Sequence, residues 1–157
     1  MKKVVYSLLI VFGVILVTGC GKEVDFSKTD YIVCSKYENK GTNNTNTILT
    51  FSYDQNEKID NFMIESDINY NDAVSKQASE VIAKTMRLIS KTLGLSFKSQ
   101  VEDKRLYYSF SGNINTFKTL MKQLDKSYNE DKIKGDTKQE AIDELTKDGY
   151  TCHDIKK

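Results

Sequence analysis

Apolar and polar residues alternate with a period of two in five stretches of the chain, a pattern typical of half-buried strands. The stretches cover residues 31–36, 47–53, 58–68, 95–101 and 106–110. In the second, Leu49, Phe51 and Tyr53 share one face, with polar residues on the other. Short polar turns connect several of these stretches. The pattern therefore predicts antiparallel strands that pair with their neighbours in the chain.

The spacing changes to three and four residues after the third strand, which predicts a helix from about Asn71 to Leu93. Its apolar stripe comprises Val74, Ala78, Val81, Ile82, Thr85, Leu88 and Ile89. Asn71 is a suitable N-terminal cap, and Gly94 stands where a left-handed residue ends a helix. We expect the stripe to face the core. A partner-binding face is the alternative.

Two more helices are predicted after the last of the five strands. The first has apolar residues spaced three and four apart, namely Phe117, Leu120, Met121, Leu124 and Tyr128. The second starts with a capping box over residues 137–140 and ends at Gly149, which places Tyr150 against Leu145. The order βββ-α-ββ-α-α predicts an α+β fold with an antiparallel sheet of about five strands and helices packed on one face.

The N-terminus carries a different pattern. Lys2 and Lys3 precede an apolar run over residues 4–17. This run of about 14 residues is shorter than the roughly 20 needed to cross a bilayer. A charged start, a short apolar run and small residues at its end predict a secretory signal peptide. An uncleaved N-terminal helix is the alternative.

The end of that run, Val17, Thr18, Gly19 and Cys20, resembles the lipobox of bacterial lipoproteins. The resemblance implies that Cys20 is lipidated, that residues 1–19 are removed, and that acyl chains anchor the protein on the outer side of a membrane. In a Gram-negative cell Gly21 would imply the outer membrane, because it is not the Asp associated with inner-membrane retention. Residues 20–29 would be a short tether.

Cleavage before Cys20 would leave about 138 residues, enough for one domain over residues 30–157. Loss of Lys2 and Lys3 would change the net charge from +1 to about −1. A near-neutral chain without a dense basic run disfavours nucleic acid as a partner. Gly41, within a run of Asn and Thr, predicts a loop over residues 37–46.

Cys34 and Cys152 are the cysteines that lipidation would leave. An even pair in an exported protein predicts a disulfide. A metal or redox pair that includes His153 is the alternative. Two sulfurs and one imidazole fall short of the four ligands of a structural zinc site, and there is no C-x-x-C motif. We therefore predict neither metal nor cofactor.

Catalytic motifs are absent from the sequence: it has no G-x-S-x-G, H-E-x-x-H, P-loop or G-x-G-x-x-G pattern. His153, the single histidine, lies near the chain terminus. The alternating polar residues Asp125, Ser127, Asn129 and Asp131, with Asp136, resemble a calcium loop, but Glu130 replaces the required glycine. A polar helix end is the better interpretation.

The mature region also resembles small lipoproteins of the YehR type. The resemblance rests on the lipobox, on a Tyr-x-x-Cys strand (residues 31–34) and on a closing Gly-Tyr-Thr-Cys (residues 149–152). Proteins of that type have no assigned activity, so the resemblance supports the fold and the cysteine pairing alone.

We therefore expect a non-catalytic binding module of the cell envelope, which holds an envelope protein or glycan on an open sheet face or edge. Tyr107, opposite in phase to its apolar neighbours, would lie on the outer face of the sheet. The alternatives are a small envelope hydrolase or redox enzyme, and a structural surface lipoprotein without a specific ligand.

Overall fold

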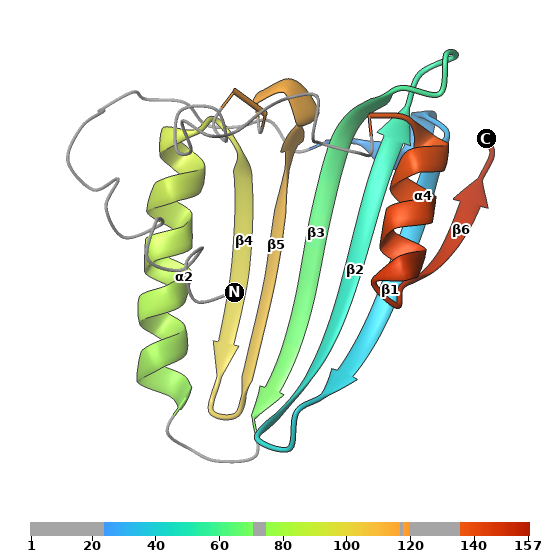
Figure 1. Cartoon of the computed structure of the whole chain (residues 1–157). Coiled ribbons are helices and arrows are strands. Elements are labelled where there is room, and N and C mark those ends of the chain that lie inside the picture. The colour runs from blue at the N-terminus through green and yellow to red at the C-terminus, as the bar shows by residue number, and fades with distance from the viewer. Residues whose placement is uncertain (1–23, 71–74, 117, 120–135) are drawn as a thin grey trace.

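The computed structural model describes residues 24–70, 75–116, 118–119 and 136–157. Its strands form one six-stranded antiparallel sheet in the order β4-β5-β3-β2-β1-β6 (Figure 1). The strands are β1 (Tyr31–Asn39), β2 (Asn43–Tyr53), β3 (Ile59–Tyr70), β4 (Ser96–Glu102), β5 (Arg105–Asn113) and β6 (Thr151–Ile155). The helices are η1 (Phe26–Lys28), α2 (Ser75–Thr92) and α4 (Lys138–Lys147). The predicted α+β fold with an antiparallel sheet is confirmed.

Residues that lie directly opposite on neighbouring antiparallel strands share a face of the sheet. One such row crosses all six strands through Cys152, Cys34, Leu49, Ile64, Phe110 and Phe97. We call this side the apolar face and the reverse side the polar face. The apolar face carries both helices: α4 lies in front of β1 and β2 (Figure 1), and Arg87 of α2 reaches Ser99 on the apolar side of β4 at 3.4 Å.

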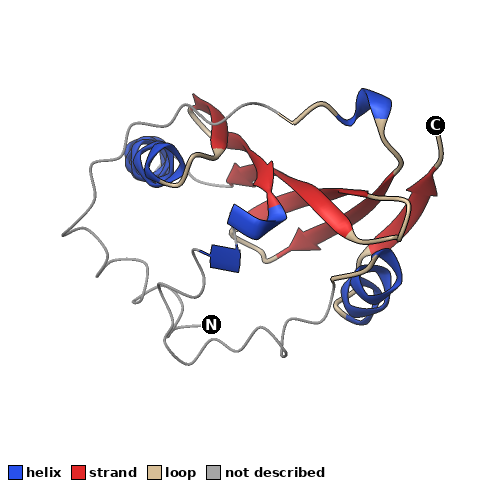
Figure 2. Cartoon of the chain, turned by 90° about the horizontal axis from the view of Figure 1, so that it is seen from above, coloured by secondary structure: helices blue, strands red, loops and turns tan. Residues whose placement is uncertain are grey.

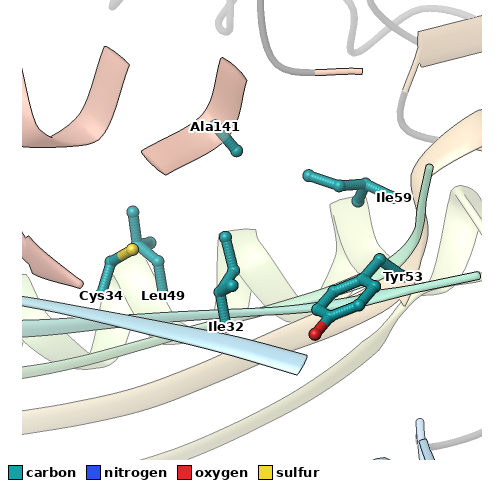
Figure 3. Close-up of a cluster of buried hydrophobic side chains, with 6 residues drawn as sticks. All are labelled: Ile32, Cys34, Leu49, Tyr53, Ile59 and Ala141. Atoms are coloured by element: carbon teal, nitrogen blue, oxygen red, sulfur yellow. The ribbon is translucent and has the colours of Figure 1, made fainter. Parts of the chain in front are cut away.

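The larger core cluster fills the space between α4 and the apolar face (Figure 3). Its buried members are Ile32, Cys34, Leu49, Tyr53, Ile59 and Ala141. Ala141 of α4 points toward the side chains that rise from the strands, and Ile142 and Leu145 pack beside it. Each large apolar side chain that is fully buried contributes about 1.5–3 kcal/mol. This contact fixes α4 on the sheet.

A second cluster, at the other end of the apolar face, comprises Phe62, Leu95 and Phe110. The rings of Phe62 and Phe110 lie 5.6 Å apart. From above, α2 and α4 lie at opposite ends of the twisted sheet (Figure 2). Helix α4 packs on the larger cluster, whereas α2 contacts β4 and β5, the strands that carry Phe97 and Phe110.

Several local signals at the predicted turns and caps are confirmed, whereas Asn71, the predicted cap of the first helix, lies outside the described residues. Thr137 and Glu140 form the expected capping box of α4, and Gly149 has a φ of 86° after its end. The Tyr150 amide then donates to the Leu145 carbonyl at 2.9 Å. At the hairpin between β2 and β3, the Asp54 carboxylate accepts two backbone hydrogen bonds, and this fixes the predicted turn.

The sheet differs from the prediction at two places. Residues 151–155 form a sixth strand, β6, which pairs with β1. The predicted loop over residues 37–46 is wrong, because β1 continues to Asn39 and β2 already begins at Asn43. Gly41, with a φ of 75°, makes the turn between them. Asn44 and Asn46 lie on the polar face, whereas Asn43 and Thr45 lie on the apolar face, so it is pairing with β1 and β3 that holds this polar stretch as a strand.

Helix α2 is present, but the predicted core-facing stripe is wrong. Among the side chains of α2 that the structure describes, Ser79, Ala83 and Ser90 are buried, whereas Val81, Ile82 and Leu88 are 63%, 46% and 59% exposed. Small side chains allow the helix to lie close to the sheet, and the Ser90 hydroxyl donates to the Met86 carbonyl at 2.6 Å. Amphipathic spacing predicts a helix without saying which side meets the sheet.

The second predicted helix falls mostly outside the described residues. Residues 114–116 and 118–119 are helical, whereas residues 117 and 120–135 lie outside them. Among the helices that are described, none is long and apolar enough to span a bilayer.

Candidate functional site

Cys34 and Cys152 form a disulfide with an S–S distance of 2.05 Å. They lie directly opposite each other on β1 and β6, with their Cα atoms 4.0 Å apart. Cys34 is fully buried, and Cys152 packs against the larger core cluster. The bond therefore joins the first strand to the last across 118 residues of sequence.

The metal alternative needs His153 beside the two sulfurs. Successive side chains of a strand point to opposite faces, so His153 lies opposite Val33 on the polar face while Cys152 lies on the apolar face. Within the described ranges, no group of three or more His, Cys, Asp and Glu residues gathers as a metal site. The sulfurs are joined to each other, and the alternative gains no support.

Several predicted site residues lie outside the described residues. These are the lipobox residues Val17, Thr18, Gly19 and Cys20, and the calcium-loop candidates from Asp125 to Asp131. Asp136, the last of those candidates, is described, and its carboxylate pairs with the Lys118 ammonium group.

The polar face carries hydrogen-bonding and aromatic side chains in ordered rows. One row crosses five strands through Tyr37, Asn46, Asp67, Tyr107 and Gln100. Neighbouring strands are about 4.8 Å apart, so Tyr37 and Tyr107, which are three strands apart, are separated by about 14 Å. Tyr37 is 66% exposed. The predicted outer-face position of Tyr107 agrees with this register.

Two contacts hold the centre of this row in place. The Tyr107 hydroxyl donates to Glu65 at 2.7 Å, and burial together with that carboxylate raises the pKa of Tyr107 to about 12. Arg105 donates two hydrogen bonds to Asp67, both at 2.8 Å, and these lower the pKa of the Asp67 carboxyl. Bidentate pairing of this kind fixes geometry as well as charge. The row therefore offers a pre-arranged polar surface.

A second polar cluster lies at the edge of the larger core cluster, where α4 begins and β6 ends. Lys138 contacts Glu57 at 2.7 Å and Asp154 at 3.1 Å, and its ammonium group lies 4.9 Å from the Tyr53 ring centre. The Tyr53 hydroxyl donates to Asp154 at 2.5 Å. Lys156 lies over the same ring and contacts Asp30 at 3.3 Å.

The charge states in this second cluster favour a structural role. Hydrogen bonds to Glu57 and Asp154 raise the pKa of Lys138, and burial raises the pKa of Tyr53. Burial opposes ionisation of Asp154, but hydrogen bonds from Tyr53 and Lys138 outweigh it and lower the Asp154 pKa. A general acid or base works best with a pKa near the operating pH. All three pKa shifts lead away from pH 7, which disfavours a role in proton transfer. We therefore interpret the cluster as a clasp, a set of contacts that holds β6 on the rest of the fold.

Sequence reasoning found the cysteine pair and Tyr107 but missed the rest of the polar row and the clasp. Tyr37 and Asn46 fall in the stretch predicted to be a loop. In a loop, the order of residues does not assign side chains to one face of a sheet, so the row could not be inferred there. Lys138 and Asp154 meet only because β6 returns to β1, and no local pattern indicates that pairing.

Comparison with protein-family models, with curated proteins and with solved structures found no match for this chain. The class of this protein is therefore defined by its fold alone: α+β, with one six-stranded antiparallel sheet and a disulfide between the first and last strands. The resemblance to YehR-type lipoproteins stays a prediction.

Proposed function

We propose that this protein is an exported, lipid-anchored binding module of the bacterial cell envelope, whose polar sheet face holds an envelope glycan. The observation that carries the binding role is the row of Tyr37, Asn46, Asp67, Tyr107 and Gln100 across that face. The helices α2 and α4 both lie on the other side of the sheet, so neither covers this row.

The chemistry of the row suits a sugar chain. Tyrosine rings offer flat apolar surfaces that end in a polar hydroxyl, and they can stack on the C–H faces of sugars. Amide and carboxylate side chains supply the donors and acceptors that sugar hydroxyls need. The spacing of about 14 Å between Tyr37 and Tyr107 would let a chain of several sugar units reach both rings.

The export part of the proposal is supported by two independent features. The sequence Val17-Thr18-Gly19-Cys20 ends an apolar run that follows two lysines, as in lipoprotein precursors. The disulfide between Cys34 and Cys152 belongs to an oxidising compartment, because cytosolic thiols are normally kept reduced. Both features support the proposal that the domain lies on the outer side of a membrane.

The binding role is tested with insoluble peptidoglycan as the probe. The mature protein, acylated on Cys20 and held in detergent, should sediment with purified peptidoglycan. Tyr37→Ala and Asn46→Ala should release it, because both residues lie on the proposed contact row. Gln139→Ala is the matched control, since Gln139 is exposed on α4 at the other side of the sheet. Equal sedimentation of all four proteins, or of none, would refute the glycan-binding role.

The anchor is tested by intact mass of the protein extracted from membranes, with and without reductant. We expect a chain that begins at acylated Cys20, with Cys34 and Cys152 unreactive to alkylation until they are reduced. A full-length chain without acyl groups would overturn the anchor, and Cys20→Ala provides the unacylated reference.

A further inference from the structure

Helix α2 presents an apolar side to the exterior. Val81 and Leu88 are 63% and 59% exposed, and Ile82 is 46% exposed. At 100° per residue, Val81 and Leu88 lie on the side of the helix opposite Ala83, which faces the sheet. Large aliphatic side chains gathered on one exposed surface indicate a contact surface.

This surface is separate from the packing that holds α2 on the sheet. Ser79, Ala83 and Ser90 make that contact and are 1%, 6% and 1% exposed. An occupant could therefore cover the outward side without displacing the helix. The outward side of α2 is therefore accessible to a binding partner.

The charge of α2 indicates which partner it suits. The helix contains four basic residues, Lys76, Lys84, Arg87 and Lys91, and one acidic residue, Glu80, a net charge of +3. Lys84, Arg87 and Lys91 are exposed and lie, together with the one acidic residue, along one flank of the apolar side, which keeps an excess of positive charge. A strongly amphipathic helix with low overall hydropathy and basic polar residues is the type that lies in the interface of an anionic bilayer.

The position of Val24 beside the C-terminal end of α2 agrees with this partner. Val24 and Asp25 line a surface hollow together with Gly94, which follows α2 by two residues. Val24 lies four positions after Cys20 in the sequence, and an extended chain spans at most about 14 Å between two such residues. A lipid on Cys20 would hold Val24, which lines the same hollow as Gly94, within about 14 Å of the bilayer surface.

We propose that the outward side of α2, formed by Val81, Ile82 and Leu88 with its basic flank, lies on the anionic headgroup region of the membrane that carries the protein. This inference rests on the proposed lipid anchor. It adds a second membrane contact to the anchor and thereby fixes the orientation of the domain on the bilayer.

The test uses a single tryptophan as a reporter, because the natural chain contains none. The mature variant Leu88→Trp, acylated on Cys20, is reconstituted in vesicles of phosphatidylglycerol and phosphatidylcholine with brominated acyl chains. We expect a blue shift of its emission and a loss of intensity relative to vesicles without bromine. The matched variant is Tyr37→Trp, at an exposed position on the polar face of β1, and it should show neither change.

Charge removal gives a second readout. Lys84→Gln and Lys91→Gln should each reduce the ratio of membrane-bound to released α2 about fivefold, and added salt should act in the same direction. Lys147→Gln, which removes an exposed charge on α4, is the control and should have no effect.

The outcomes separate this inference from the proposed function. Missing acyl mass would refute the anchor and, with it, this orientation. In an acylated protein, a tryptophan at position 88 that is neither shifted nor quenched would refute the membrane contact alone. A blue shift without quenching would also refute it, because protein would then cover this side. The mass of the protein in detergent, measured by sedimentation velocity, would then identify the cover: a second copy of the chain would double the mass, whereas residues 117–128 of the same chain would leave it unchanged.

Discussion

Removal of the disulfide between Cys34 and Cys152 should cost the domain a large part of its stability. The bond closes a loop of 118 residues. In the chain-entropy description, a loop of this length stabilises the folded state by about 5 kcal/mol, because the cross-link restricts the unfolded chain. Domains of this size are stable by about 5–15 kcal/mol in total, so this one bond supplies a third or more of that amount.

The assay is urea unfolding of the double variant Cys34→Ala/Cys152→Ala beside the natural protein, followed by circular dichroism. We expect a midpoint lowered in proportion to about 5 kcal/mol, or a variant that is already unfolded without urea. The double variant leaves no free thiol at either position. Ser35→Ala, at an exposed position next to Cys34, is the control and should change stability by less than about 0.5 kcal/mol.

A loss below about 2 kcal/mol, the lower end of the range typical of native disulfides, would refute this reasoning. It would mean that β6 is held mainly by the clasp around Lys138 and by its backbone pairing with β1. Protection of the β6 amides from hydrogen exchange would then persist in the double variant, whereas we expect it to be lost first.

Three further predictions follow from contacts in the core and at the helix ends. Gly112→Ala should destabilise the domain by about 1–3 kcal/mol in urea unfolding, because the added Cβ would lie 2.1 Å from the buried Leu95 Cδ2 atom. Thr137→Ala should cost about 1 kcal/mol in the same assay, because it removes the cap of α4. Asp154→Asn should make the free energy of unfolding fall less between pH 7 and pH 3 than it does in the natural protein. The pKa of Asp154 is lowered in the folded state, so its contribution is present above the ordinary Asp value of about 3.9 and is lost as the pH falls through the folded value.

Each of these predictions has its own control. Gly41→Ala should also destabilise, but through its φ of 75°, since no atom lies within 4 Å of the added Cβ. Gln139→Ala, in the first turn of α4, should leave stability nearly unchanged. For the acid titration, unfolding midpoints at pH 7 and pH 3 are compared, and an equal drop in Asp154→Asn and in the natural protein would contradict the assignment.

Local patterns in the sequence predicted the elements well, since strand alternation and helix caps are properties of short segments. The capping box at Thr137 and the turn glycines Gly94 and Gly149 fall at the expected places. The five predicted strands are all present. The disulfide was predictable too, but the prediction rested on the oxidising compartment expected for an exported protein and not on the distance between the two cysteines.

Features that depend on tertiary placement were not predictable in the same way. Residues 151–155 alternate weakly, with Cys152 and Ile155 as their only apolar members, so β6 is defined by its partner β1. In α2 the more polar side meets the sheet, because Ser79 and Ala83 permit a close approach. Clasp residues such as Lys138 read as ordinary surface positions in the sequence, and their contacts arise from segments far apart in the chain.

The pairing of β6 with β1 also affects the timing of biogenesis. The first strand of the sheet must wait for the last residues of the chain before its outer edge is paired. During synthesis or export from the N-terminus, Ile32 and the thiol of Cys34 would therefore stay accessible until residues 151–155 arrive. Until then β1 is an open edge able to pair with other chains. Loss of only the last few residues would make that temporary exposure permanent, and the truncated protein should aggregate.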